Sequence, residues 1–403
     1  MKSGKSIIFI LALSLIFMTI LPQSSQADPL DNWIAVTSGT DNWLYGIAYG
    51  NNKFVAVGLF STITSLTSPD GVVWTSNTSG SGVDVYHLNG IAFGNPFGNG
   101  IFVAVGVSGT ILTSSDNGVS WIKRTSGTRH FLYGITYGDS IFVAVGESDT
   151  ILTSPDGINW TERFSGSFYE LDGVTYGDST FVAVGESGRI FTSTNGENWY
   201  LEDSGTDMCL TGVDYGNGTF VAVGQSGTIA TSDHGINWTV GALELTGWLH
   251  AITFENGTFV AVGESGRIFT SPDGVSWTER TSGTIYTLEA VTHGSGKFAA
   301  VGGLGTILLD YDETPLDPVR IWRAHYIDYY KKIQDAYYWA WDGNIIEIQA
   351  LQFNENLIFD TNKTVILRGG FNSTYSTNPS STTINGSITI SDGTVVVENI
   401  VIM

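Results

Sequence analysis

The stretch from Phe259 to Thr284 reads FVAVGESGRIFTSPDGVSWTERTSGT, and a near copy from Phe181 to Thr206 reads FVAVGESGRIFTSTNGENWYLEDSGT. The word that opens both stretches occurs in seven related forms, and its last four spacings are each 39 residues. The seven opening phenylalanines are Phe54, Phe102, Phe142, Phe181, Phe220, Phe259 and Phe298. Repeats of about 40 residues built from short apolar words are typical of propeller blades. The repeat therefore predicts seven blades.

Each copy holds four short strand-like words separated by turn residues. In the sixth copy these words are residues 249–254, 259–262, 268–271 and 277–280. The segments between them carry the Gly, Asn and Asp that tight hairpin turns require. Because consecutive strands joined by hairpins form one antiparallel sheet, each copy predicts one four-stranded blade.

The seventh copy lacks its fourth strand. After Ile307-Leu308-Leu309 no tryptophan word follows, whereas residues 32–40 near the N-terminus match residues 276–284 in pattern. We expect this first strand to complete the last blade, which removes exposed strand edges from the ring. The predicted fold class is all-β, a seven-bladed propeller over residues 28–311 closed by its N-terminal strand.

The first 27 residues have the pattern of a signal peptide. Lys2 and Lys5 precede an apolar run from Ile7 to Leu21, and small residues stand near Ala27. The run is about 15 residues, short of the ~20 that a membrane-spanning helix needs. We expect an exported protein in the periplasm, on the cell surface or outside the cell. A retained N-terminal anchor is the alternative.

The charge of the chain narrows the choice of partners. The formal net charge is −22, and it becomes −24 when the leader is removed together with its two lysines. Such a chain repels phosphate backbones and anionic lipids, so we expect no nucleic-acid partner and no membrane insertion after cleavage. Cys209 is the only cysteine, which excludes a disulfide within the chain.

The tryptophan turns resemble the Asp-boxes of bacterial neuraminidase repeats. Residues 114–121 fit the pattern S-x-D-x-G-x-x-W, and in the fifth copy the acid has moved one place to Asp233. The resemblance implies scaffold residues at the blade periphery, where the acid caps the turn and the tryptophan packs between blades. These residues are Asp70, Trp74, Asp116, Trp121, Asp156, Trp160, Trp199, Trp238, Asp273 and Trp277.

Two further comparisons bear on function. With the Phe-Val-Ala-Val-Gly word and the Gly-x-x-Gly-x-Ile turn, residues 33–309 look like the photosystem II assembly and stability factor propellers, which implies the fold more than the role.

A sialidase would need three converging arginines. Arg124, Arg163 and Arg280 instead share one repeat position, and Arg189 and Arg267 share another, so they belong to a rim.

Positions that differ between copies are free to serve function. Three such positions in each copy, 21 residues in all, flank the repeated leucine of the first strand, in loops that open around the channel. Eight of these 21 residues are Phe, Trp or Tyr. Aromatic residues with a few polar groups suit sugar or peptide recognition, and packing between blades is the alternative. The candidate ligand-binding residues are Trp43, Tyr45, Tyr86, His87, His130, Phe131, Tyr133, Tyr169, Asp172, Trp248, His250 and Tyr286.

The sequence predicts no catalytic residues, no metal and no cofactor. Three of the histidines come from different blades without metal-ligand spacing. Glu147, Glu186 and Glu264 follow the Phe-Val-Ala-Val-Gly word and should make the channel face negative as solvated turn acids, with a cation site as the alternative. An enzyme would need acids and aromatics to converge there, namely Glu170, Asp172, Tyr133 and His250.

A second domain follows a proline-rich linker at residues 312–318. Within residues 319–403 we expect a short helix over 329–340, then strand words at 344–348, 364–370, 382–386, 387–390 and 395–402. This segment resembles the opening of a pectin-lyase-like right-handed β-helix of about three coils. Its apolar end at residues 400–403 either pairs with another surface or lies under a loop.

These patterns together predict an exported binding or scaffold protein without enzymatic activity. The channel face would recognise a protein or a glycan, and the C-terminal end offers a possible site of association with itself or a partner. A secreted sialidase-like enzyme or other glycosidase, and a purely structural cell-surface protein, are the alternatives.

Overall fold

The structure is a computed structural model. It describes Leu30 and residues 33–59, 65–77, 87–98, 100–166, 168–243, 246–310, 319–322, 327–330, 332–371 and 381–402. The predicted leader (1–27) and linker (312–318) lie outside the described residues. No helix in the described part has the length and apolarity needed to cross a membrane.

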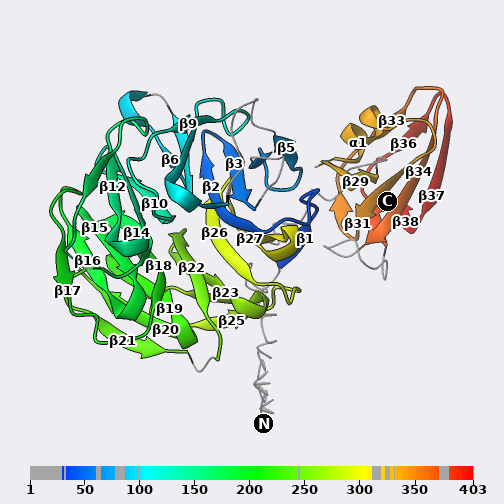
Figure 1. The fold of residues 1–403 in the computed structure, drawn as a ribbon. Coiled ribbons are helices and arrows are strands. Elements are labelled where there is room, and N and C mark those ends of the chain that lie inside the picture. The colour runs from blue at the N-terminus through cyan, green and yellow to red at the C-terminus, as the bar shows by residue number, and fades with distance from the viewer. Residues whose placement is uncertain are drawn as a thin grey trace, which may run out of the picture.

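Seven four-stranded antiparallel sheets form the propeller, and Figure 1 shows them arranged in a ring. Blades one to three consist of β2 (Leu44–Gly50), β3 (Lys53–Gly58), β4 (Ser65–Ser68) and β5 (Thr75–Asn77); β6 (Leu88–Gly94), β7 (Ile101–Gly106), β8 (Thr110–Ser114) and β9 (Ile122–Arg124); and β10 (Leu132–Gly138), β11 (Ile141–Gly146), β12 (Ile151–Ser154) and β13 (Thr161–Arg163). Blades four and five consist of β14 (Leu171–Gly177), β15 (Thr180–Gly185), β16 (Ile190–Ser193) and β17 (Tyr200–Glu202); and β18 (Leu210–Gly216), β19 (Thr219–Gly224), β20 (Thr228–Ser232) and β21 (Thr239–Ala242).

The last two blades complete the ring. They consist of β22 (Leu249–Glu255), β23 (Thr258–Gly263), β24 (Ile268–Ser271) and β25 (Thr278–Arg280); and β26 (Leu288–Gly294), β27 (Lys297–Gly302), β28 (Ile307–Asp310) and β1 (Trp33–Val36). β1 pairs antiparallel with β28, from Trp33 opposite Asp310 to Val36 opposite Ile307. The predicted seven-bladed fold and its closure by the N-terminal strand are confirmed.

Short 3-10 helices mark the turns between the second and third strands of six blades, and one more lies in the first hairpin of blade two. They are η2 (Pro96–Gly98), η3 (Val107–Gly109), η4 (Glu147–Asp149), η5 (Glu186–Gly188), η6 (Gln225–Gly227), η7 (Glu264–Gly266) and η8 (Gly303–Gly305).

The Phe-Val-Ala-Val word is repeated because its strand is buried on both faces. In β3, Phe54 and Ala56 pack in the core shared with blade seven, whereas Val55 and Val57 pack in the core shared with blade two. Successive side chains of a strand point to opposite faces, so four consecutive apolar residues fill two cores. The glycine that ends the first strand is needed for a close approach, since a Cβ on Gly50 would lie 2.0 Å from the Phe93 ring.

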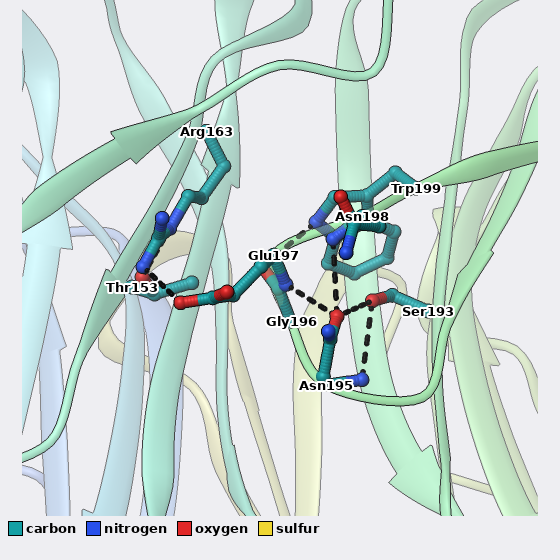
Figure 2. A network of polar contacts seen from close by, with 8 residues as sticks. All are labelled: Thr153, Arg163, Ser193, Asn195, Gly196, Glu197, Asn198 and Trp199. Atoms are coloured by element: carbon teal, nitrogen blue, oxygen red, sulfur yellow. Dashed lines mark hydrogen bonds and ion pairs between the residues drawn. The ribbon is translucent and has the colours of Figure 1, made fainter.

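The tryptophan turns lie at the outer strands and connect neighbouring blades. Figure 2 shows the turn of blade four, where Asn195 Oδ1 accepts the backbone N–H groups of Glu197 and Asn198 at 2.9 and 3.0 Å. Trp199 Nε1 donates to Gly196 O at 3.0 Å, and Arg163 of blade three pairs with Glu197 at 2.7 Å.

The acid-capped turn recurs in the other copies, with one exception. Asp70, Asp116, Asp156 and Asp273 each accept backbone N–H groups from their own turns. Trp74, Trp121, Trp160, Trp238 and Trp277 each donate Nε1–H to the turn glycine. In the fifth copy, where the acid has moved, the buried Ser232 Oγ has no hydrogen-bond partner.

The C-terminal residues form three sheets. The elements are β29 (Val319–Trp322), β30 (Ile327–Tyr330), α1 (Ile333–Trp339), β31 (Asn344–Gln349), β32 (Gln352–Phe353), β33 (Leu357–Phe359), β34 (Thr364–Phe371), β35 (Thr382–Ile384), β36 (Ile388–Ile390), β37 (Thr394–Glu398) and β38 (Ile400–Ile402). The sheet orders are β30-β29-β31-β34-β37, β32-β35-β38 and β33-β36. All pairings among β31 to β38 are parallel, whereas β29 in the largest sheet pairs antiparallel with both β30 and β31.

Two predicted boundaries in this region are wrong. The helix expected over 329–340 begins only at Ile333, because Ile327–Tyr330 pairs with β29 as a strand, and Glu355 accepts the backbone N–H groups of Ile333 and Gln334 at 3.1 and 3.2 Å. The strand word at 395–402 is divided into β37 and β38, since Asn399 between them has a φ of 53°.

Candidate functional site

Each inner strand of the propeller contains a β-bulge at the same place. In blade three, Leu132 is opposite Gly146 and Gly134 is opposite Val145, so Tyr133 is the extra residue. The bulged residues of the seven blades are Tyr45, Asn89, Tyr133, Asp172, Thr211, His250 and Glu289. A bulge redirects a side chain and ends regular pairing, which sets these seven residues apart from the blade cores.

The bulged residues surround a cavity of about 180 Å³ where the seven inner strands meet. Six of the seven line it, and blade three contributes Gly134 and Ile135. The column of residues that follows the repeated leucine therefore lines the central channel.

The repeated leucines hold these positions in place. Each of the seven leucines is at most 1% exposed. By contrast, none of the candidate residues that the structure describes belongs to the buried core. Trp43, Tyr45, Tyr133, Asp172, Trp248 and His250 are half-buried, and His87, His130, Phe131, Tyr169 and Tyr286 are exposed. Tyr86 lies outside the described residues.

Four carboxylates of blades three and four lie close together, and the pKa values of two of them, Glu170 and Asp172, are raised. We call Glu147, Glu170, Asp172 and Glu186 the acid cluster. Burial, followed by the charges of Glu170 and Glu186, raises the pKa of Asp172 to about 7. Burial and the charges of Glu186 and Glu147 raise the pKa of Glu170. Neighbouring negative charges that no nearby cation neutralises raise the pKa of a carboxyl group in this way.

Tyr133 lies against the acid cluster. Burial raises its pKa to about 12, and the charges of Glu170, Glu147 and Asp172 add to this effect. Three of the four residues that an enzyme would need, Tyr133, Glu170 and Asp172, are thus near one another.

The fourth, His250, faces a different carboxylate. Its Nδ1 is 3.8 Å from Glu289 Oε2, and its buried Nε2 has no hydrogen-bond partner. Burial lowers the pKa of His250, against the opposing charge of Glu264. Burial and the charge of Glu264 raise the pKa of Glu289 to about 7. Glu289 was not among the candidate residues, although it stands in the same column as Asp172 and His250.

Two of the turn acids also hold the channel loops. Glu147 Oε2 accepts the backbone N–H of Phe131 at 3.1 Å, and Glu264 Oε2 accepts that of Trp248 at 3.2 Å. A carboxylate that accepts a backbone N–H fixes the preceding loop and keeps one oxygen available. These acids are therefore structural as well as charged.

The outer part of this face differs between blades. The Arg189 guanidinium lies 4.5 Å from the centre of the Tyr169 ring, beside a cavity of about 600 Å³ that is also lined by Glu202, Asp203 and Asp207. In blade three the equivalent contact joins His130 Nδ1 and Thr150 Oγ1 at 2.8 Å. Within the described ranges no group of three or more His, Cys, Asp or Glu residues has metal-site geometry.

No protein-family profile matches the chain, and no curated protein matches it. Solved structures do. YCF48 bound to D1 peptide is 18% identical with a TM-score of 0.58, and the match covers 70% of this chain and 95% of that chain. YCF48 from Cyanidioschyzon merolae is 15% identical with a TM-score of 0.56, covering 70% and 99%. An inactive virginiamycin B lyase from Staphylococcus aureus with quinupristin is 13% identical with a TM-score of 0.60, covering 69% and 98%.

The likeness is one of fold. The matches cover about the share of the chain that forms the propeller, and the identities are too low to carry over residues or activities. The sequence resemblance to photosystem II assembly factor propellers is confirmed at this level.

Proposed function

We propose that the propeller is a binding platform that recognises a protein segment through its channel face. The segment would present a basic group to the acid cluster and apolar side chains to the exposed aromatics around it. One observation carries this proposal: in the described part of the chain no Lys or Arg forms an ion pair with the acid cluster or with its neighbour Tyr133, and the pKa values of Tyr133, Glu170 and Asp172 are raised.

Uncompensated charge of this kind favours a cationic ligand. The ligand-free protein holds several carboxylates close together, and a Lys or Arg side chain placed among them would relieve their repulsion. Phe131, which is 41% exposed and whose backbone N–H is bound by Glu147, provides apolar contact area beside them. Electrostatic complementarity of this type gives specificity and fast association.

The comparisons support a protein ligand over a glycan. A propeller with this fold, YCF48, has been solved bound to a D1 peptide, and another neighbour is the WD40 propeller domain of Doa1. We also propose that the chain is exported through the predicted leader and that the tryptophan turns are Asp-boxes. The acid-capped turns support the Asp-box interpretation.

The test uses matched peptides. Labelled extended peptides that differ only in Lys, Glu or Gln at one position are titrated against the chain at low and high ionic strength. We expect the Lys peptides to bind, salt to weaken them, and Asp172→Asn to weaken them roughly tenfold because a half-buried charge partner is lost. Glu162→Gln on the outer strand β13 is the control. Equal binding to both variants would refute the role of the channel face.

A glycosidase is the second candidate, because a carboxyl group with a pKa of about 7 suits a general acid. Hydrolysis of a glycan panel by the parent chain, lost in Asp172→Asn, would favour that activity. Binding of glycans without hydrolysis would instead make the ligand a sugar. If the channel face binds neither class, the structural role remains.

A further inference from the structure

One arginine of blade four lacks a partner for its charge. Within the described part of the chain Arg189 forms no hydrogen bond and no ion pair, and its buried Nε is unsatisfied. Its guanidinium lies 4.5 Å from the centre of the Tyr169 ring, a contact that uses none of its N–H donors. Because these donors lie in one plane, the side chain is suited to bind a planar carboxylate.

Comparison with blade six shows what is missing in blade four. Arg267 stands at the same repeat position, and its Nη1 lies 3.8 Å from Glu279 Oε1 of the same blade. Glu279 is opposite Phe269 in the outer hairpin. The equivalent residue of blade four, opposite Phe191, is Leu201. Blade four therefore lacks the carboxylate that neutralises the arginine in blade six.

The fold of the blade does not require an arginine at this position. Blades two, three, five and seven have threonine there. The hydroxyl groups of Thr150, Thr228 and Thr306 donate to the backbone carbonyl that opens the preceding 3-10 turn, at 2.6, 2.7 and 2.6 Å. Since threonine satisfies the turn in those blades, it can replace Arg189 without disturbing blade four.

Arg189 lines the cavity of about 600 Å³ at the outer part of the channel face. Cavities of this size hold small molecules. Glu202, Asp203 and Asp207 line it as well, so its walls carry one positive and three negative formal charges. A simple anion would meet three carboxylates, and a simple cation would leave the arginine unpaired. A molecule with one carboxylate and more than one positive group matches both kinds of wall.

The lining groups are held in place by the chain. Glu202 Oε1 accepts a hydrogen bond from Thr192 Oγ1 at 2.7 Å, and Asp203 Oδ1 accepts the backbone N–H of Gly205 at 3.0 Å. Each carboxylate keeps a second oxygen that can accept a hydrogen bond from a ligand. Leu201, which is 53% exposed, adds an apolar surface to the same wall.

We propose that this cavity binds a free basic amino acid, an α-amino acid with a positively charged side chain. Its carboxylate pairs with Arg189, and its two positive groups lie among Glu202, Asp203 and Asp207. Its methylene chain contacts Leu201, as the stems of long cationic side chains commonly do on apolar surfaces. A neutral amino acid offers one positive group fewer to the three carboxylates and binds more weakly.

Three small molecules of matched shape test the proposal. L-lysine carries all three charges, cadaverine lacks only the carboxylate, and L-norleucine lacks only the side-chain ammonium. Ligand-observed NMR titrations against the full chain measure their affinities. We expect lysine to bind roughly tenfold more tightly than cadaverine, because a charge-assisted pair with an arginine is lost. We expect it to bind roughly two- to fivefold more tightly than norleucine, because one exposed charge pair is lost.

Two matched variants assign the effect to one arginine. Arg189→Thr introduces the residue that four other blades have, and it should lower the affinity for lysine to that for cadaverine. The affinity for cadaverine should stay at the parental value, which shows that the cavity is intact. Arg267→Thr makes the same change in blade six, where the arginine is already paired, and it should leave both affinities unchanged.

Several results would overturn the proposal. They are equal affinities of the parent for lysine and cadaverine, no binding of lysine up to about 10 mM, and a preference for lysine that survives Arg189→Thr. Lysine binding that Arg189→Thr retains and Asp172→Asn removes would place the ligand in the acid cluster instead. The cavity and the acid cluster have no carboxylate in common, so either site can fail without the other.

Discussion

Asp172 should destabilise the propeller at neutral and alkaline pH, and Asp172→Asn should remove that effect. In the folded chain the pKa of Asp172 is raised from 3.8 to about 7 by burial and by Glu170 and Glu186. One pKa unit corresponds to about 1.4 kcal/mol, so three units set an upper limit of about 4 kcal/mol. Solvent access and relaxation around a half-buried group reduce the expected gain to about 2 kcal/mol.

The pH dependence has a definite sign. Unfolded Asp172 loses its proton near pH 4 and the folded group near pH 7. Between these values the unfolded state binds fewer protons, so the free energy of unfolding falls as the pH rises. Asp172→Asn and the parent should therefore be equally stable near pH 4, diverge up to about pH 7, and keep a constant difference above it.

Urea titrations of the parent, Asp172→Asn and the exposed-strand control Glu162→Gln at several pH values measure this difference. Glu289, whose pKa is also raised to about 7, contributes a slope of the same sign to all three proteins and cancels in the comparison. A difference that does not change with pH, or a variant less stable than the parent at pH 8, would refute the electrostatic account of the acid cluster.

Three further outcomes follow from the contacts of the propeller. Asp214→Ala should destabilise the ring by about 3 kcal/mol, because its half-buried carboxylate accepts hydrogen bonds from Thr175 Oγ1 and from Phe254 N, one in each neighbouring blade. An unchanged urea midpoint would contradict this. Trp121→Phe should lower the free energy of unfolding by about 1 kcal/mol, because the hydrogen bonds from Nε1 to Gly118 O and Ser65 Oγ are lost. Trp121→Ala should lower it by about 4 kcal/mol, because the packing of the ring in the core is lost as well. Equal losses of stability on thermal melting would show that packing is not the larger contribution. Deleting residues 33–36 should expose the edge of β28 and cause aggregation in light scattering, and a monomer of parental stability would show that closure is dispensable.

The sequence predicted the blades because the same physical requirement recurs in every copy. A strand between two cores needs consecutive apolar residues, which six copies provide as Phe-Val-Ala-Val, and six of the seven inner strands end on glycine, so repetition itself exposes the architecture. The same comparison found the column that lines the channel. It did not reveal the bulges, because the register shift after each leucine depends on pairing with the next strand, which the alternation of residues does not record.

Contacts between different copies were beyond the sequence. The acid cluster joins Glu147 of blade three with Glu170, Asp172 and Glu186 of blade four, and only the ring geometry brings these side chains together. The helix boundary at Ile333 failed for a similar reason, since a partner strand at β29 claims Ile327–Tyr330, whose local sequence also suits a helix. At this boundary, non-local strand pairing overrode local propensity.

The seam between β1 and β28 also dictates an order of events during synthesis. Trp33 pairs with Asp310, its partner 277 residues later in the chain. The ribosome must therefore complete all seven repeats before the first strand finds its place, and until then the ring is an open arc with two unpaired ends. Contacts so distant in sequence form slowly, and nascent chains with open edges are prone to misassembly. The same strand that secures the finished disc thus makes its biogenesis vulnerable, and a chaperone that shields β1 during translation would act at the step where this protein is most exposed.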